Sequence, residues 1–251
     1  MAKKYFFYFL LLFLLPLFLL AQKKGVSKRL YKSASITIPY SLIYINCDSS
    51  DQELPLLLFL HGAGERGNDN TSQLEVGLPR LIKNINQPCL IVAPQCPKNE
   101  KWVDTDWTKP RHTMEKHSNN TLTAVVKILD SLINTPLKID STRVYVTGLS
   151  MGGFGTWELI QRYPEKFSAA VPVCGGGDLM QCGNLLNIPI WAFHGKKDKL
   201  VPVSRTMNMV DEINRQGGKA KVTIFESKGH LCWDEVYSDN KVVEWLMSKQ
   251  K

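Results

Sequence analysis

The sequence predicts an α/β fold in which a mostly parallel sheet carries helices on both faces. Two apolar runs, residues 55–60 and 89–93, contain no charged residue, as is typical of strands covered on both sides. Apolar residues with helical spacing over 122–133 separate them from the next strand-like run, residues 143–147. Strands that alternate with helices connect in parallel, and 251 residues suit one domain of this kind.

The same alternation continues toward the carboxyl terminus. The further elements expected there are a strand at 168–173, a strand ending at His194, a strand at 220–225, and helices from Met151, over 204–216 and from about residue 239.

At the amino-terminal side, residues 35–38 and 42–45 are split by Pro39-Tyr40 and are expected to form an antiparallel hairpin at a sheet edge. Two long connections, residues 94–117 and 175–188, are expected to line a functional site. Neither has room for a large lid, so the cleft should be open.

The first residues are expected to be a secretory signal. Two lysines precede an apolar run over residues 5–20, which is short for a membrane span and is interrupted by Pro16. Leu19 is larger than the residue usual at that distance from a cut, so an uncleaved anchor stays an alternative. The prediction is a signal peptide at 1–21 and one catalytic domain at 22–251, secreted or periplasmic.

The formal net charge is +8, but the basic residues are scattered and form no dense tract. We therefore expect no nucleic-acid partner, and membrane contact only through an uncleaved signal. The six cysteines show no metal-ligand spacing. An exported chain favours disulfides, and Cys174 and Cys182 could staple one loop, but buried thiols fit the sequence equally well.

The segment Gly-Leu-Ser-Met-Gly at residues 148–152 directly follows the strand-like run 143–147. Glycines on both sides of Ser150 permit a strained turn from strand to helix that lifts the hydroxyl to the sheet edge. The first amides of the following helix favour negative charge there. The pattern indicates a serine nucleophile.

A serine hydroxyl needs a base to take its proton and an acid to orient that base. Of five histidines, His230 alone lies in a late loop behind a glycine, after the run 220–225. Asp198 is the favoured acid because it follows the strand next to the histidine loop. Asp178 is its rival, since some hydrolases place the acid after the preceding strand. Of the other histidines, His61 and His194 are expected to be structural and His112 and His117 solvated.

Five segments together resemble a known family: residues 60–67, 92–97, 148–153, 194–198 and 229–230. They are similar to α/β-hydrolases of the esterase and dienelactone-hydrolase type. The narrower resemblance is to secreted esterases related to carbohydrate esterase family 1 and polyhydroxybutyrate depolymerases, sometimes labelled predicted peptidases. It spans almost the whole chain after residue 30. It implies Ser150 as nucleophile, Asp198 as acid and His230 as base, without a metal or organic cofactor.

The oxyanion of the intermediate needs two amide donors. Met151, after the nucleophile, should supply one, and the loop at 61–64 the other, with Ala63 preferred to Gly64. Glu65 and Arg66 are expected to pair and hold this loop. In the first long connection, Trp102 and Trp107 are either loop anchors or an aromatic wall for a sugar ring or phenolic acyl group.

The resulting prediction is a secreted serine esterase whose substrate is a small or polysaccharide-linked ester, with feruloyl and acetyl esters suggested by the resemblance. Two alternatives remain open. One is a peptidase of the prolyl-oligopeptidase type, weakened because no gating propeller precedes the catalytic region. The other is a non-catalytic carbohydrate- or protein-binding module, against which the intact Ser-Asp-His set argues.

Overall fold

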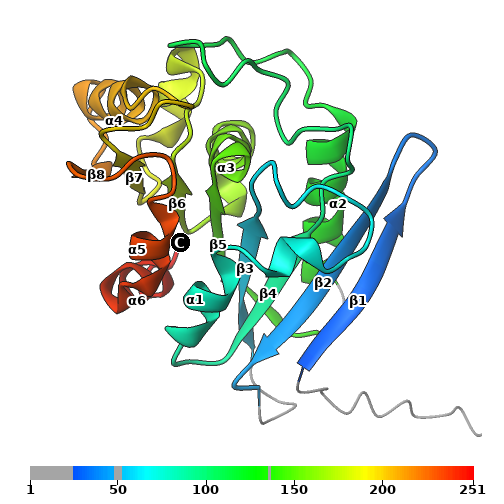
Figure 1. The fold of residues 1–251 in the computed structure, drawn as a ribbon. Helices are drawn as coiled ribbons and strands as arrows, with labels where there is room; N and C mark the ends of the chain where they lie inside the picture. The colour runs from blue at the N-terminus through cyan, green and yellow to red at the C-terminus, as the bar shows by residue number, and fades with distance from the viewer. Residues whose placement is uncertain (1–24, 48–52, 135–136) are drawn as a thin grey trace, which may run out of the picture.

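A computed structural model describes residues 25–47, 53–134 and 137–251 and confirms the α/β architecture. Eight strands in this part of the chain form one sheet in the order β1-β2-β4-β3-β5-β6-β7-β8 (Figure 1). The predicted signal peptide at 1–21 lies outside the described residues.

Six strands form the parallel part of the sheet: β3 (Leu54–Leu60), β4 (Cys89–Pro94), β5 (Ile139–Leu149), β6 (Ala169–Val173), β7 (Trp191–Gly195) and β8 (Lys221–Phe225). Every residue of β3, β4 and β6 is buried, because side chains on both faces meet helices. The continuous apolar runs in the sequence therefore identified these strands correctly.

Helices cover the sheet in two layers (Figure 1). One layer contains α2 (Asn120–Ile133), α3 (Met151–Arg162) and α4 (Ser204–Arg215), and the other contains α1 (Leu78–Lys83), α5 (Trp233–Ser238) and α6 (Asn240–Met247). Side chains of β5 alternate between the two cores: Val144 and Val146 face the first, and Tyr145 and Leu149 the second. Short 3-10 helices occur at Ser72–Leu74 (η1), Pro164–Lys166 (η2) and Leu179–Leu185 (η3).

The amino-terminal hairpin is present, but its predicted strands were wrong. It is formed by β1 (Gly25–Lys32) and β2 (Thr37–Ile45), and β2 continues through Pro39. Pro39 O accepts from Gln95 N at 2.8 Å, beyond the end of the β2–β4 ladder, which starts at Tyr40. The nitrogen and the carbonyl of a strand residue face the same side, so the nitrogen of Pro39 also faces β4. It lies there beyond the end of the ladder, and its missing N–H therefore removes no ladder hydrogen bond.

Parallel pairing brings the carboxyl ends of the strands to one edge of the sheet. Leu60 of β3 pairs with Gly148 of β5, and Gly195 of β7 pairs with Phe225 of β8. The residues that follow these ends therefore gather in space. The two long connections also leave from this edge: the first contains no helix or strand between β4 and α2, and the second contains η3. Within the described residues no helix has the length and apolar character needed to cross a membrane.

Candidate active site

Ser150 occupies a sharp turn between β5 and α3. Its φ of 54° and ψ of −117° are unusual for a residue with a side chain, and its N–H donates to Val173 O at 2.9 Å. The backbone around it is crowded: a Cβ on Gly152 would lie 1.9 Å from Leu60 O, and one on Gly148 would lie 2.5 Å from Gly152 O. Only glycine fits at these two positions, so the sequence pattern is a steric requirement of the turn.

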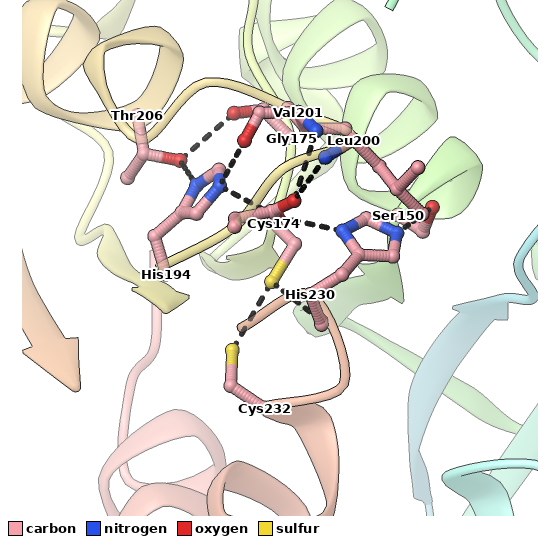
Figure 2. Close-up of polar contacts among 10 residues, drawn as sticks. Ser150, Cys174, Gly175, His194, Leu200, Val201, Thr206, His230 and Cys232 are labelled. Atoms are coloured by element: carbon pink, nitrogen blue, oxygen red, sulfur yellow. Dashed lines mark hydrogen bonds and ion pairs between the residues drawn. The ribbon is translucent and has the colours of Figure 1, made fainter. Parts of the chain in front are cut away.

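The three predicted triad residues lie in hydrogen-bond contact. Ser150 Oγ is 2.8 Å from His230 Nε2, and His230 Nδ1 is 2.6 Å from Asp198 Oδ2. Figure 2 shows the His230 ring between the serine and the loop after β7. A carboxylate can only accept, so Nδ1 carries the proton and Nε2 is left to accept from the hydroxyl. The arrangement can deprotonate Ser150.

The Asp198 side chain is completely buried, and both of its oxygens are hydrogen-bonded. Oδ1 accepts from the amides of Leu200 and Val201 at 2.8 and 2.9 Å, while Oδ2 faces both His230 and His194. Burial by itself raises the pKa of this carboxyl, but the hydrogen bonds from His194, His230 and the two amides outweigh it and hold the pKa well below its usual range. Asp198 therefore stays ionised.

Asp178, the rival acid, lies in a different environment. It caps η3, where Oδ1 accepts from Met180 N at 2.9 Å, and Oδ2 accepts from Met114 N at 2.9 Å. Its carboxylate joins the two long connections, and in the described chain no histidine is hydrogen-bonded to it. In the structure, Asp178 therefore caps η3 and holds the two long connections together.

The predicted oxyanion donors flank Ser150. Met151 begins α3, and Gly62, Ala63 and Gly64 line the cleft that contains the serine. Within the described chain, the N–H groups of Ala63 and Met151 donate to no protein acceptor. These N–H groups therefore have no protein partner that would prevent them from donating to a bound group.

The loop that carries Ala63 is held differently from the prediction. Arg66 does not pair with Glu65; its guanidinium donates to Ala63 O at 2.9 Å and to Glu100 O at 3.3 Å. Glu65 Oε2 instead lies 3.9 Å from His61 Nδ1. Arg66 therefore fixes the loop through backbone carbonyls.

A cleft of about 710 Å³ opens over the serine. Its lining combines apolar side chains with an acidic rim, and includes Leu149, Leu200, Val201, Trp107, Trp233, Asp104 and Asp106. Lys101 Nζ lies 5.0 Å from the centre of the Trp107 ring, which steadies that wall by a cation–π contact. The cleft can hold an apolar acyl or alcohol group beside Ser150.

The two tryptophans of the first long connection have different environments. Trp107 is half-buried and lines the cleft. For Trp102 the substrate-wall prediction was wrong: the side chain is 0% exposed, and its Nε1–H donates to His61 O at 3.0 Å. The ring packs against Gly155 of α3, where an added Cβ would lie 2.9 Å from Trp102 Cβ. Trp102 anchors the connection to the core.

A comparison with known protein families assigns the chain to one of them. Residues 43–241 match the Phospholipase/Carboxylesterase family, so the match covers most of the chain, including all three triad residues. The chain belongs to this family. The prediction of an α/β-hydrolase of the esterase type is thereby confirmed.

The chain is also similar to individual proteins, among them an esterase. A thermostable esterase of known structure is 35% identical, has a TM-score of 0.82 and matches 90% of this chain, which covers 64% of that protein. A ferulic acid esterase shares the fold at 15% identity, with a TM-score of 0.64 over 89% of this chain and 98% of its own. A protein of Arthroderma benhamiae named "Uncharacterized secreted protein" is 24% identical over 80% of this chain, which spans 24% of that relative.

His61 is structural, as expected for a histidine at the end of β3. Its Nδ1–H donates to Gly62 O at 2.5 Å, and its Nε2 accepts from Cys96 N at 2.9 Å. Burial lowers the pKa of His61 to about 4, because the apolar surroundings disfavour the charged ring. In this carboxylesterase-family chain, His61 therefore joins the loop at 61–64 to the segment after β4 as a neutral side chain.

We expect His61 to make the folded protein sensitive to acid. The folded state keeps the ring neutral down to about pH 4, whereas the unfolded chain protonates it near 6.5, so the unfolded state binds more protons in between. The contribution is fully present above pH 6.5 and declines toward pH 4, a loss of about 3 kcal/mol. Urea unfolding at pH 7 and 4.5 measures it. His61→Gln, which does not titrate, should lose less over this interval, and an equal loss in both proteins would contradict the assignment.

Trp107 and Trp102 should respond differently to truncation. Trp107→Ala should lower kcat/KM for aromatic or glycosidic esters by roughly threefold to tenfold and spare an aryl acetate, because only ring contacts worth about 0.5–1.5 kcal/mol are lost. Trp102→Ala should cost roughly 3–5 kcal/mol of stability and affect all substrates alike. Thermal midpoints and kcat/KM on both esters test this. Unchanged substrate preference in Trp107→Ala would remove the aromatic wall.

Both His112 and His117 were predicted to be solvated. His117 is exposed, but His112 is partly buried. Arg205 Nη2 donates to His112 Nδ1 at 2.6 Å, and burial lowers the pKa of His112 to about 4, so its ring is neutral. The contact attaches the first long connection of this family member to α4. Sequence periodicity gives no sign of it because the partners are 93 residues apart.

The cysteines form no disulfide among the described residues, and the loop staple between Cys174 and Cys182 is not made. Cys174 Sγ instead lies 3.1 Å from Cys232 Sγ. Sequence spacing also missed a buried group in which ligand atoms of Cys174, His194 and Asp198 lie within 4.8 Å of one another. The Asp198 and His194 atoms of this group already bond to each other, so a metal ion there would have to break this hydrogen bond.

Proposed function

We propose that this chain is a secreted serine esterase that hydrolyses carboxylic esters through an acyl-enzyme. The observation that carries the proposal is the hydrogen-bonded line from Ser150 through His230 to Asp198 beside an apolar cleft. Family membership supports an ester as the substrate. The domain comprises residues 22–251, and secretion is supported by the predicted signal and by the relative named as secreted.

The reaction proceeds in two halves. Ser150 Oγ attacks the carbonyl carbon while its proton passes to His230 Nε2, and the oxyanion accepts from the N–H groups of Met151 and Ala63, with Gly64 as the alternative second donor. His230 then donates its proton to the departing alcohol. A water molecule attacks the acyl-enzyme by the same path and releases the acid. Every proton is accounted for by the triad, so the proposed mechanism uses neither a metal nor an organic cofactor.

The lining of the cleft supports the proposed substrate class. Trp107 and Trp233 offer aromatic surface within reach of an acyl or alcohol group bound to Ser150. This favours a small ester or one linked to a polysaccharide, feruloyl or acetyl, and the fold shared with a ferulic acid esterase is in keeping with it. Nucleic acid is not among the proposed partners, and a membrane is one only through an uncleaved signal.

A fluorophosphonate probe tests the nucleophile directly. The protein comprising residues 22–251 should form one covalent adduct, located by mass spectrometry on the peptide that contains Ser150. A panel of feruloyl, acetyl and longer-chain aryl esters beside acylated peptides then tests the bond cleaved. Absence of labelling would support a binding module, and faster cleavage of the peptides would support the peptidase alternative.

A further inference from the structure

Beside the predicted triad, the ring of His194 has three hydrogen-bond contacts. It lies in β7, and its side chain is completely buried. Its Nε2 is 3.1 Å from Asp198 Oδ2 and 3.1 Å from Val201 O. Its Nδ1 is 2.8 Å from Thr206 Oγ1. Figure 2 marks this contact with a dashed line. Each ring nitrogen therefore has a partner whose hydrogen-bonding capacity is known.

The partners of Nε2 decide whether it carries a proton. A backbone carbonyl oxygen accepts only, and so does an ionised carboxylate. Asp198 is ionised, because its hydrogen bonds hold its pKa well below the usual range. Nothing at Nε2 can donate, so Nε2 itself must be the donor.

The partner of Nδ1 decides whether His194 carries a second ring proton. Thr206 Oγ1 also lies 2.8 Å from Gly175 O, a carbonyl oxygen that can only accept. A hydroxyl has one proton, and here it is directed to Gly175. The Thr206 oxygen can then only accept from His194, so Nδ1 carries a proton as well.

We propose that His194 is a buried imidazolium that shares the Asp198 carboxylate with His230. In the proposed esterase it is a positioning residue that sets the pH range over which His230 acts as a base. This catalytic consequence rests on the proposed function, whereas the protonation of His194 rests on its hydrogen-bond partners and does not depend on ester hydrolysis.

The charged surroundings are consistent with a buried cation at this place. Asp198 supplies the counter-ion within hydrogen-bond distance, which offsets the desolvation of the pair. Among the described residues, other titratable groups near the cluster include Cys174, which follows β6, His230 and Cys232 beyond β8, and Arg205, which precedes Thr206 on α4. The hydrogen bond with Cys232 raises the pKa of the Cys174 thiol, and burial raises it further, so that group is neutral. The Arg205 guanidinium points toward His112 and lies 4.8 Å from the centre of the Phe154 ring.

Sharing one carboxylate between two rings has a consequence for the base. A second positive charge on the same oxygen weakens the attraction of Asp198 for a proton on His230. The proposed esterase should therefore keep activity further toward the acidic side of its profile.

Nitrogen-15 NMR of the wild-type protein tests the protonation without any substrate. At neutral pH both ring nitrogens of His194 should show directly bonded protons, assigned by their loss in His194→Gln. Burial slows the exchange of these protons with water, which makes them observable. A single protonated nitrogen on His194 would overturn the proposal, whether or not the protein hydrolyses esters.

The pH dependence of kcat/KM tests the catalytic consequence. Thr206→Val removes the acceptor for Nδ1–H at similar side-chain volume, and His194→Gln removes the charge. Both should move the acid limb to higher pH by about one unit. Thr206→Ser keeps the hydroxyl and should keep the wild-type midpoint, and Thr206→Val alone carries the test if His194→Gln does not fold. An acid limb of Thr206→Val that superimposes on the wild type would overturn the positioning role. A protein inactive on every ester would refute the proposed function, and the NMR result would then decide on His194 alone.

Discussion

Ser150→Ala is expected to abolish ester hydrolysis, with kcat/KM falling on the order of 10⁴-fold or more. The hydroxyl is the atom that forms the acyl bond, and triad members act as a unit, so no other group replaces it. The fold should be unchanged, because Ser150 Oγ bonds only to His230 among the described residues and alanine meets the same backbone strain at φ 54°.

The control for this variant is a serine outside the cleft. Ser238 is exposed at the end of α5, so Ser238→Ala should retain both turnover and thermal midpoint. Hydrolysis rates and melting curves of the two variants beside the wild type complete the comparison. Turnover close to wild type in Ser150→Ala would show that another residue is the nucleophile.

Asp198→Asn is expected to reduce kcat by about 10⁴-fold, because an amide no longer holds the His230 tautomer that accepts the serine proton. Asp178→Asn should leave the chemistry nearly intact. It weakens the hydrogen bonds to Met114 N and Met180 N, at a cost of about 1–3 kcal/mol in stability.

The pair of variants also decides between the two candidate acids. Both substitutions exchange one carboxylate oxygen for an amide at nearly constant volume, so packing changes little. Steady-state rates on one aryl ester and urea midpoints for both proteins suffice. If Asp178→Asn lost activity and Asp198→Asn did not, the acid role would move to Asp178.

Strands β3, β4 and β6 were predictable because all their residues are buried, so each strand appears in the sequence as an uninterrupted apolar run. β1 has no such signature: its burial pattern is mostly exposed, and it carries Lys28, Arg29 and Lys32. An edge strand with one covered side needs few apolar residues, so the hairpin was assigned to the wrong segments. The six-residue helices α1 and α5 are too short to show a helical period.

The contact between Ser150, His230 and Asp198 was predictable for a topological reason, since the three residues follow strands whose carboxyl ends share one sheet edge. Side-chain direction was not predictable in the same way. The burial of Trp102 depends on its Nε1–H reaching His61 O, 41 residues away. The link between His194 and Asp198 does have a local signal, because the two are four residues apart across a tight turn.

The Gly-Leu-Ser-Met-Gly pattern around Ser150 combines two separate requirements, one for folding and one for the proposed chemistry. A Cβ on Gly152 would lie 1.9 Å from Leu60 O, so that glycine is needed to close α3 against β3 whether or not any ester is cleaved. A descendant that lost the Ser150 hydroxyl would still require both glycines in order to fold. The two glycines therefore indicate the shared fold, and we expect them to be retained in inactive relatives. The proposed activity has to be judged from Ser150, Asp198 and His230.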